Sequence, residues 1–193
     1  MNLRCSALPL AFQCPGSVRS ESTEVLIKIA NEGGPLGSAV HEVLAALVLG
    51  HNGDGPDVRA VAMKYGVDAD DLTRLVAYGL HAWKSLAQYY PDPSTEQEMD
   101  YVTPAFTLTG HMDVHSTGEE WANFLDWKSG YKQPDYFHQL MGYARLLFAA
   151  YPSIKTVRAT VVWLRDWPQE TLLVTSEDPM QWEDSHHDRV VSG

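Results

Sequence analysis

The spacing of the apolar residues changes abruptly at Pro91–Pro93, and this change restricts the folds open to the chain. Before it, from Asp70 to Tyr90, apolar residues recur every three or four positions, which predicts a long helix capped by Asp68 or Asp70 and ended by Pro91. After it, the spacing falls to two, and short polar turns separate the segments. The pattern predicts three consecutive strands: Glu96–Val102, Phe106–Val114 and Trp121–Lys128.

Strands joined by such short turns must pair as an antiparallel meander. The helical spacing of Tyr136–Ala150 follows them, so this helix can return the chain for a parallel partner strand. Two more strands, Thr156–Leu164 and Glu170–Thr175, complete the series, and helices are predicted upstream at Ser38–Leu49 and Val58–Tyr65. The fold class is therefore α/β, a mixed β-sheet flanked by helices in the order αβββαβ.

A chain of 193 residues is expected to form a single domain, 1–193, with a core of its own. Residues 1–36 are predicted to be irregular, 51–93 a helical insertion, and 177–193 a polar tail that is either a weak helix or poorly ordered. The longest apolar run, Val43–Leu49, is too short for a membrane span. No secretory signal is evident, and with only two cysteines a reducing cytoplasm is the expected location.

The net charge of −11 argues against a nucleic-acid partner when it is taken for the whole chain. Its distribution weakens that objection. Between Trp127 and Arg165, six basic residues stand against one acidic residue, Asp135, so this stretch carries +5 and the remainder −16. A locally basic groove is compatible with this pattern, and Lys132 and Arg145 within it are candidates to bind substrate.

Asp126 and Lys128 lie two residues apart on the third predicted strand, so both side chains point to the same face of the sheet. A carboxylate and an ammonium group placed in this way can hold a divalent cation and orient a water molecule, which the cation makes a better nucleophile. The simpler alternative is a surface ion pair beside the Ser129–Gly130 turn, because Asp-X-Lys is common by chance.

Asp113, near the end of the second strand, is expected at about the level of Asp126 on the third. Two carboxylates brought together on adjacent strands repel each other unless a cation lies between them. Strict alternation would place His111 and Asp113 on one face of the strand and Met112 and Val114 on the other. The alternative for Asp113 is an aspartate that caps the coming turn.

Polar residues on two predicted helices complete the set. His41 lies one turn after Gly37 on the first core helix, where an imidazole can supply a nitrogen ligand to a metal; an ordinary structural histidine is the alternative. Gln139 and Tyr143, four residues apart, share one face of the later helix and can donate to a phosphate or hold Lys128 in position. For these two, the alternative is the polar edge of an amphipathic helix.

Together these residues follow the order Gly-X-X-X-His, Glu, Gly-X-X-Asp, Asp-X-Lys and Gln-X-X-X-Tyr on helix, strand, strand, strand and helix. In this order the chain resembles the PD-(D/E)XK nuclease superfamily, and in particular its RecB-type exonucleases, which include Cas4-like proteins and phage nucleases. The resemblance covers Cys14 to Thr175. It implies a restriction-endonuclease-like α/β core and a bacterial or phage-encoded protein.

The resemblance also implies a metal centre for Mg²⁺ or Mn²⁺. Its ligands would come from three elements: His41, Asp113, Asp126 and the backbone carbonyl of Trp127. Lys128 would be the catalytic lysine beside them.

Further roles follow from the same resemblance. Glu98, on the first strand, would be a supporting acid near the metal, and Glu96 is its competitor because both share a strand face. Gln139 and Tyr143 would correspond to the motif that contacts DNA and supports the lysine.

Many Cas4-like relatives hold an iron–sulfur cluster with one N-terminal cysteine and three near the C-terminus. This chain has only Cys5 and Cys14, so a four-cysteine cluster cannot be built from it and none is expected. Either this branch lacks the cluster or the sequence is truncated near Val190–Gly193, and both alternatives stay open.

The sequence therefore predicts a metal-dependent deoxyribonuclease, an exonuclease that hydrolyses phosphodiester bonds with a metal-activated water. Its expected partners are DNA and, by resemblance to phage nucleases, a recombination or annealing protein. The alternative is a catalytically inactive module that binds nucleic acid or protein on the same fold. An unrelated zinc hydrolase is disfavoured, because the chain has no His-X-His or His-Glu-X-X-His cluster.

Overall fold

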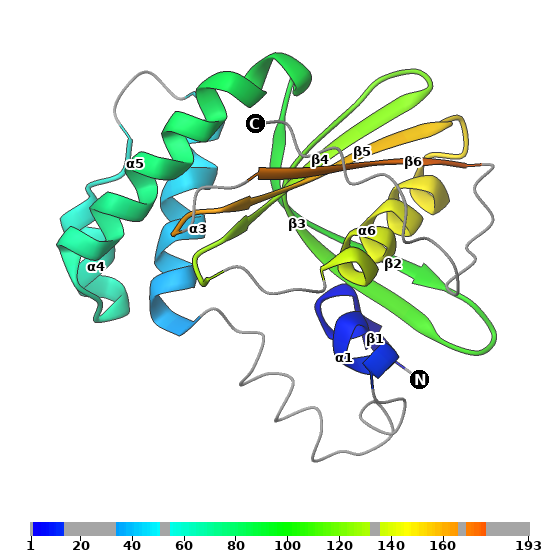
Figure 1. Cartoon of the computed structure of the whole chain (residues 1–193), viewed down its shortest axis with the longest axis horizontal. Helices are drawn as coiled ribbons and strands as arrows, with labels where there is room; N and C mark the ends of the chain where they lie inside the picture. The colour runs from blue at the N-terminus through cyan, green and yellow to red at the C-terminus, as the bar shows by residue number, and fades with distance from the viewer. Residues whose placement is uncertain (1, 14–33, 51–54, 132–135, 166–168, 177–193) are drawn as a thin grey trace.

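The computed structural model describes residues 2–13, 34–50, 55–131, 136–165 and 169–176. Within them, one six-stranded mixed sheet lies between helices, as Figure 1 shows. The strands are β1 (Asn2–Arg4), β2 (Ser94–Val102), β3 (Thr107–Thr117), β4 (Trp121–Lys128), β5 (Thr156–Trp163) and β6 (Gln169–Thr175). The predicted α/β class, with a mixed sheet flanked by helices, is confirmed.

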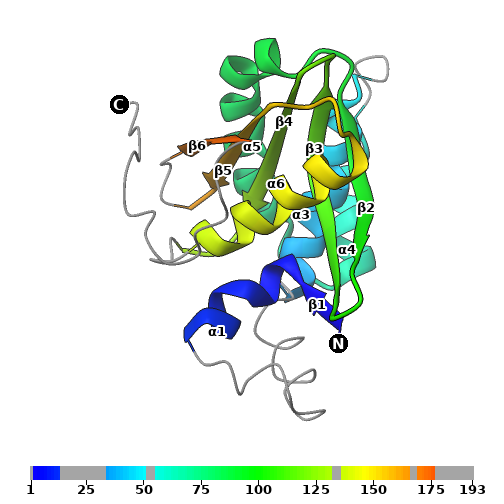
Figure 2. The same ribbon diagram turned by 90° about the vertical axis from the view of Figure 1, so that its right-hand side faces the viewer.

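The helices cover both faces of this sheet. They are α1 (Leu8–Gln13), α3 (Gly34–Val48), α4 (Val58–Tyr65), α5 (Ala69–Leu86) and α6 (Phe137–Ala150). Figure 2 shows α6 in front of the sheet and α3, α4 and α5 behind it. One apolar core lies between the sheet and α6, and a second between the sheet and α3–α5. Among the described helices, none has the length and apolar character that crossing a membrane requires.

The strand pairing follows the prediction where the strands are long. β2, β3 and β4 form the antiparallel meander, and β4 pairs in parallel with β5, the strand that follows α6 in the sequence. β6, for which the sequence predicts no partner, pairs with β5 in antiparallel orientation. The prediction of irregular structure for residues 1–36 is wrong for residues 2–13, which form β1, a 3₁₀ turn and α1. β1 is only three residues long and pairs with Thr107–Thr109, far along the chain, so no local periodicity indicates it.

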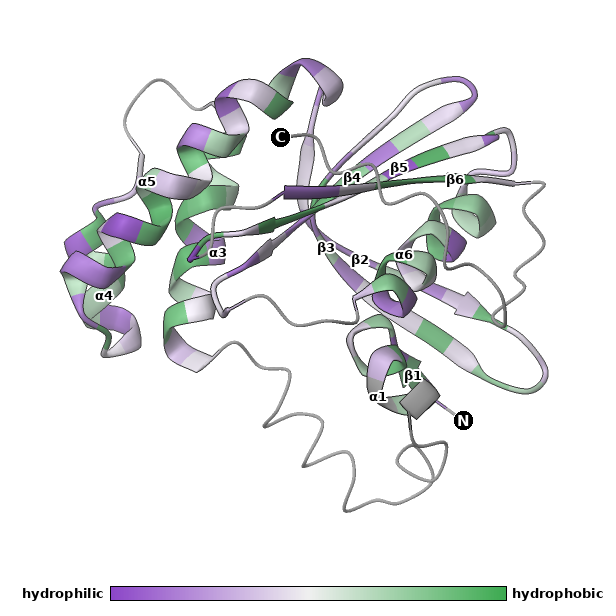
Figure 3. Cartoon of the chain, in the orientation of Figure 1, coloured by the Kyte–Doolittle hydropathy of each residue, from purple (hydrophilic) through white to green (hydrophobic). Residues whose placement is uncertain are grey.

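The helix boundaries depend on side-chain caps. Asp68 caps α5, since its carboxylate accepts hydrogen bonds from the backbone N–H groups of Asp70 (2.9 Å) and Asp71 (2.8 Å). Purple and green residues are mixed around α4 and α5 in Figure 3, as expected of amphipathic helices that pack on a core. α5 ends at Leu86, before the predicted Tyr90, whose hydroxyl instead donates to the carbonyl of Phe124 (3.0 Å).

The alternation of β3 breaks at Asp113. Met112 packs in the core below α6, but Val114 packs in the opposite core, against α3–α5. The prediction that these two residues share a face is therefore wrong. The ladder between β2 and β3 omits Asp113 and the residue opposite it, Glu96, whose φ of +54° is unusual for a residue other than glycine. This local distortion removes Asp113 from the regular pattern of the strand.

Gly110 marks the point where α6 crosses β3. A Cβ atom there would lie 2.6 Å from Leu146 Cδ1 and 2.8 Å from Tyr143 Cε1, far inside van der Waals contact. We expect Gly110→Ala to lower the free energy of unfolding by about 1–3 kcal/mol through overpacking, measured by urea denaturation. Gly130→Ala is the matched control, because a Cβ at Gly130 meets open space. Equal stability of the two variants would contradict the close packing of α6 on β3.

Candidate metal centre and active site

The strands β3 and β4 separate where the predicted acids lie. Their ladder ends at the pair Val114–Leu125, one residue short of Asp113 and Asp126. Beyond this pair, the backbone N–H of Trp127 donates to Asp113 Oδ2 at 2.6 Å. The Asp113 carboxylate thus replaces a main-chain carbonyl as the acceptor, and its other oxygen, Oδ1, faces α3.

His41 reaches that oxygen from α3. Its Nδ1 lies 3.0 Å from Asp113 Oδ1, and its Nε2 lies 3.1 Å from the carbonyl oxygen of Trp127. Burial disfavours the protonated ring, but the Asp113 carboxylate outweighs burial and raises the pKa of His41 to about 9. The imidazolium can then donate to both oxygens. These are two of the oxygen ligands that the family resemblance implies for a metal ion.

Gly37, one helical turn before His41, lets α3 approach the loop after β4. A Cβ atom at Gly37 would lie 3.0 Å from Ser129 Oγ, which is tighter than ordinary contact. The glycine of the Gly-X-X-X-His pattern therefore has a packing reason: it brings His41 within reach of the strand ends.

Glu96 is the third member of a group that also contains His41 and Asp113. One ligand atom each from His41, Glu96 and Asp113 lies within 4.8 Å of the other two. Glu98, the predicted supporting acid, lies outside this group; its backbone is opposite His111 in the β2–β3 ladder, but His111 Nε2 lies 2.8 Å from Glu96 Oε2. The competitor Glu96 takes its place, because the left-handed backbone at Glu96 breaks the alternation on which the prediction relied. Partial burial and the Asp113 carboxylate raise the pKa of Glu96.

Asp126 and Lys128 form a buried ion pair, which overturns the alternative of a surface pair. Lys128 Nζ lies 2.6 Å from Asp126 Oδ2, and the two side chains are 18% and 5% exposed. Burial opposes the charge on Lys128, but Asp126 outweighs it and raises the pKa of Lys128. Burial raises the pKa of Asp126; Lys128 lowers it, and the Asp113 carboxylate raises it further. The centre of the Tyr136 ring lies 4.9 Å from Lys128 Nζ.

Gln139 and Tyr143 share one face of α6, as predicted, but that face is the buried one. They are 2% and 4% exposed, and Gln139 Nε2 donates to the Tyr143 hydroxyl at 3.2 Å. The prediction that they contact DNA directly therefore does not fit the structure. Burial and then the charge of Asp126 raise the pKa of Tyr143, which places its hydroxyl in the electrostatic field of the site.

The other predicted substrate-binding residues lie elsewhere. Arg145 donates to the hydroxyl of Tyr101 at 2.8 Å and stacks on its ring at 4.7 Å, so its guanidinium is engaged by β2. Lys132 and Cys14 lie outside the described residues. Cys5 is buried in the core below α6.

A cleft of about 520 Å³ opens beside His41, between α3, α4 and β2. Glu42 and Tyr65 line it, and Glu42 Oε2 accepts from the Tyr65 hydroxyl at 2.7 Å and pairs with Lys64 Nζ at 2.5 Å. The sequence does not single out these residues, because α3 and α4 bring them together only in the fold. The cleft gives access to the side chains of His41 and Glu96, which are 28% and 39% exposed.

The donor set fits a hard divalent cation. Glu96, Asp113 and the Trp127 carbonyl offer oxygen, the donor that Mg²⁺ and Mn²⁺ prefer, and His41 adds one nitrogen. With a neutral imidazole, the carboxylates of Glu96, Asp113 and Asp126 and the ammonium of Lys128 sum to −2, which one divalent ion would neutralise. The single nitrogen donor favours Mn²⁺ over Mg²⁺.

Metal affinity is expected to rise with pH. His41, with a pKa of about 9, is protonated below that value, and a metal ion must displace its proton. We expect the association constant for Mn²⁺ to increase about tenfold per pH unit between pH 6.5 and 8.5, measured by calorimetry in anaerobic buffer. His41→Asn should bind more weakly and lose most of this slope. An affinity that is flat over the same range in the unmodified protein would contradict a ligand role for His41.

Comparison with known proteins leaves the family open. No protein-family model matches the chain, and no curated protein matches its sequence. A solved structure that resembles part of the fold is the crystal structure of SSO0001, with 10% sequence identity and a TM-score of 0.36 over 73% of this chain and 75% of that one. A likeness at this level supports no functional assignment.

Proposed function

We propose that this protein is a divalent-metal-dependent deoxyribonuclease that acts as an exonuclease. The observation that carries the proposal is the convergence of three elements where β3 and β4 separate. His41 from α3 meets Asp113 of β3 and the Trp127 carbonyl of β4, with the buried Asp126–Lys128 pair beside them. The order of these residues on helix, strand and strand also matches the PD-(D/E)XK resemblance.

His41, Glu96, Asp113 and the Trp127 carbonyl would hold Mg²⁺ or Mn²⁺. Asp126, which the sequence predicts as a further ligand, lies outside this group, and its Oδ2 pairs with Lys128. A bound ion of this kind lowers the pKa of water and stabilises negative charge on a phosphate. The three carboxylates gathered here would repel a polyanion such as DNA. A bound cation would offset this repulsion, so the proposed need for a cation agrees with a DNA substrate.

Lys128 supplies the positive charge that the protein itself directs at the substrate. Its raised pKa keeps the ammonium group charged at neutral pH, and Asp126 fixes its position at 2.6 Å. From there it can bind a non-bridging oxygen of the scissile phosphate and stabilise the charge that develops during attack. Because the pair is largely shielded from water, this interaction is stronger than the same contact at a protein surface.

Digestion of end-labelled DNA tests the proposal. Linear and covalently closed DNA, each in single- and double-stranded form, is incubated with Mn²⁺, Mg²⁺ or EDTA. We expect nucleotides to be released from linear DNA with either metal, no release with EDTA, and intact closed circles. Cleavage of closed circles would replace exonuclease by endonuclease action. Binding of metal without cleavage of any of the four substrates would favour the inactive binding module.

A further inference from the structure

A cationic and aromatic pair lies next to the candidate site but takes no part in holding metal. Arg165, just after β5, donates from Nε to the carbonyl oxygen of Ser129 at 2.8 Å. Its guanidinium carbon lies 5.5 Å from the centre of the Tyr131 ring. The loops that follow β4 and β5 are thereby joined at one end of the sheet.

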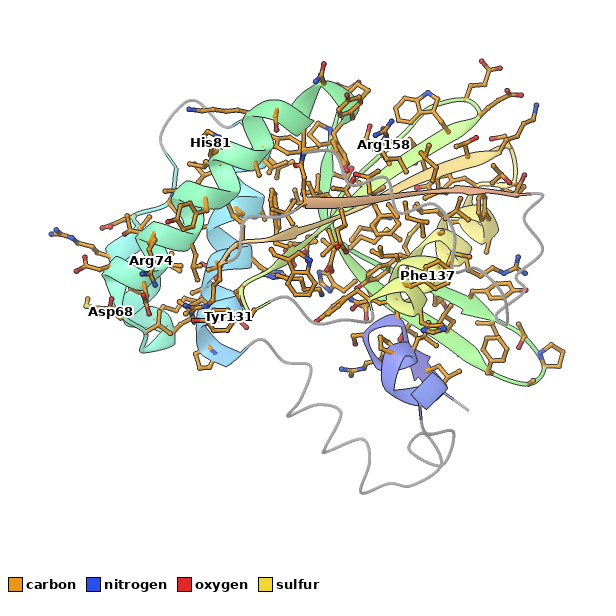
Figure 4. All side chains as sticks on the ribbon, in the orientation of Figure 1. Asp68, Arg74, His81, Tyr131, Phe137 and Arg158 are labelled. Carbon is orange, nitrogen blue, oxygen red and sulfur yellow. The ribbon has the colours of Figure 1, made fainter. Side chains whose placement is uncertain are left out.

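This pair lies at the same end of β4 as the catalytic lysine. Ser129 directly follows Lys128, and its Oγ packs against Gly37 at the start of α3. Figure 4 shows Tyr131 beside α3. Since His41 is one turn further along α3, the Tyr131–Arg165 pair borders the candidate metal centre rather than a remote surface.

The two side chains suit an unpaired nucleotide. Tyr131 is 68% exposed, which is unusual for a large aromatic ring, and a nucleobase can stack on such a ring whatever its sequence. The bond to Ser129 uses one of the five N–H donors of the Arg165 guanidinium, and a two-point contact with a phosphate needs two of the others. The position of Arg165 is set by that bond, so less conformational entropy is lost when it binds a ligand.

We propose that Tyr131 and Arg165 bind a single-stranded segment of the DNA substrate, with a base stacked on Tyr131 and a neighbouring phosphate on Arg165. The inference rests on the proposed nuclease function and adds a preference for single-stranded DNA. The bound DNA strand would be unpaired where it passes the loop after β4. Because stacking needs only the face of a base, the contact is independent of sequence.

The fold contains a matched control for this pair. Arg158, near the start of β5, stacks on Tyr89 at 4.6 Å, whereas Arg165 follows the end of the same strand. Figure 4 shows Arg158 well away from Tyr131. Variants of Arg158 and Tyr89 therefore remove the same chemistry and charge from another part of the molecule.

The test compares Tyr131→Ala and Arg165→Ala with Tyr89→Ala and Arg158→Ala. Binding of a fluorescent single-stranded oligonucleotide is measured in EDTA over a range of salt, and KM and kcat are measured with Mn²⁺. Each site variant is expected to weaken binding and raise KM by roughly 5- to 100-fold, with kcat within about threefold. Arg165→Ala should also reduce the slope of log K against log salt by about 0.7. The control variants should bind as the unmodified protein does.

Tyr131→Trp separates a local role from damage to the fold, because it keeps the stacking surface and should restore binding. Equal binding by the site and control variants, in a protein that cleaves DNA, would overturn this inference and leave the nuclease function standing. If the unmodified protein binds the oligonucleotide through Tyr131 and Arg165 but cleaves no DNA with any metal, the nuclease function fails and the binding site stands.

Discussion

Lys128→Met is expected to slow DNA cleavage by roughly 10²- to 10³-fold in kcat, with little change in metal affinity. Methionine keeps much of the length of the side chain but removes the charge that would stabilise the phosphate in the transition state. Rates with end-labelled DNA and Mn²⁺, together with metal titration by calorimetry, measure the two quantities separately. Lys155→Met is the control: Lys155 pairs with Glu120 at the surface, its side chain is 66% exposed, and its loss should leave kcat unchanged.

Lys128→Met is also expected to destabilise the protein, because the Asp126–Lys128 ion pair is buried. Removing Lys128 leaves the Asp126 carboxylate buried without its partner, which lowers the free energy of unfolding by about 3–5 kcal/mol in comparable pairs. The double variant Asp126→Asn with Lys128→Met has no unpaired charge and should recover most of this loss while staying inactive. Cleavage at the normal rate by a folded double variant would contradict the proposed mechanism.

Asp113→Asn is expected to weaken Mn²⁺ binding by about 100-fold or more, since loss of even a supporting group beside a metal ligand costs roughly 10- to 100-fold. Asparagine has the same shape and can still accept the Trp127 N–H bond, but it lacks the charge that attracts a cation. Calorimetric titration with Mn²⁺ at pH 8 measures the effect. Cleavage should fall in parallel, because the reaction depends on the ion.

The two neighbouring glutamates provide an internal control for this prediction. Glu96→Gln should weaken Mn²⁺ binding, whereas Glu98→Gln should leave it unchanged, although the residues are only two positions apart. If Glu98→Gln weakened binding as much as Glu96→Gln, the ligand group assigned from the geometry would be wrong. Normal binding by Asp113→Asn would contradict the metal centre itself.

Periodicity predicts the elements of this fold well where the signal is local. α4 and β4 begin and end at the predicted residues, because each has a regular pattern bounded by turn residues. β1 is different: three residues hold no period, and their structure depends on pairing with β3. The 3₁₀ turn and α1 that follow are also stabilised by tertiary packing rather than by spacing.

The sequence predicts the site residues correctly where side chains alternate regularly between the two faces of a strand. β4 is regular, so the spacing of two correctly places Asp126 and Lys128 side by side. On β2 and β3 the alternation breaks at Glu96 and Asp113, and a positive φ at a glutamate has no signature in the sequence. For that reason the sequence favours Glu98, whereas the structure brings Glu96 close to His41 and Asp113.

The faces of helices raise a related difficulty. Spacing of four places Gln139 and Tyr143 on one face of α6, but it does not tell whether that face is covered. Likewise, the cleft residues Glu42 and Tyr65 come from separate helices, and only the packing of α3 against α4 brings their side chains into contact.

Locating Mn²⁺ by anomalous scattering in crystals soaked with MnCl₂ tests most directly whether these side chains form one cation site. We expect a single strong peak within about 2.0–2.4 Å of the His41 imidazole and of Asp113 and Glu96 carboxylate oxygens, near Lys128. A protein that binds no Mn²⁺ at this position, or binds it only on a distant surface, would contradict the assignment of a metal-dependent active site.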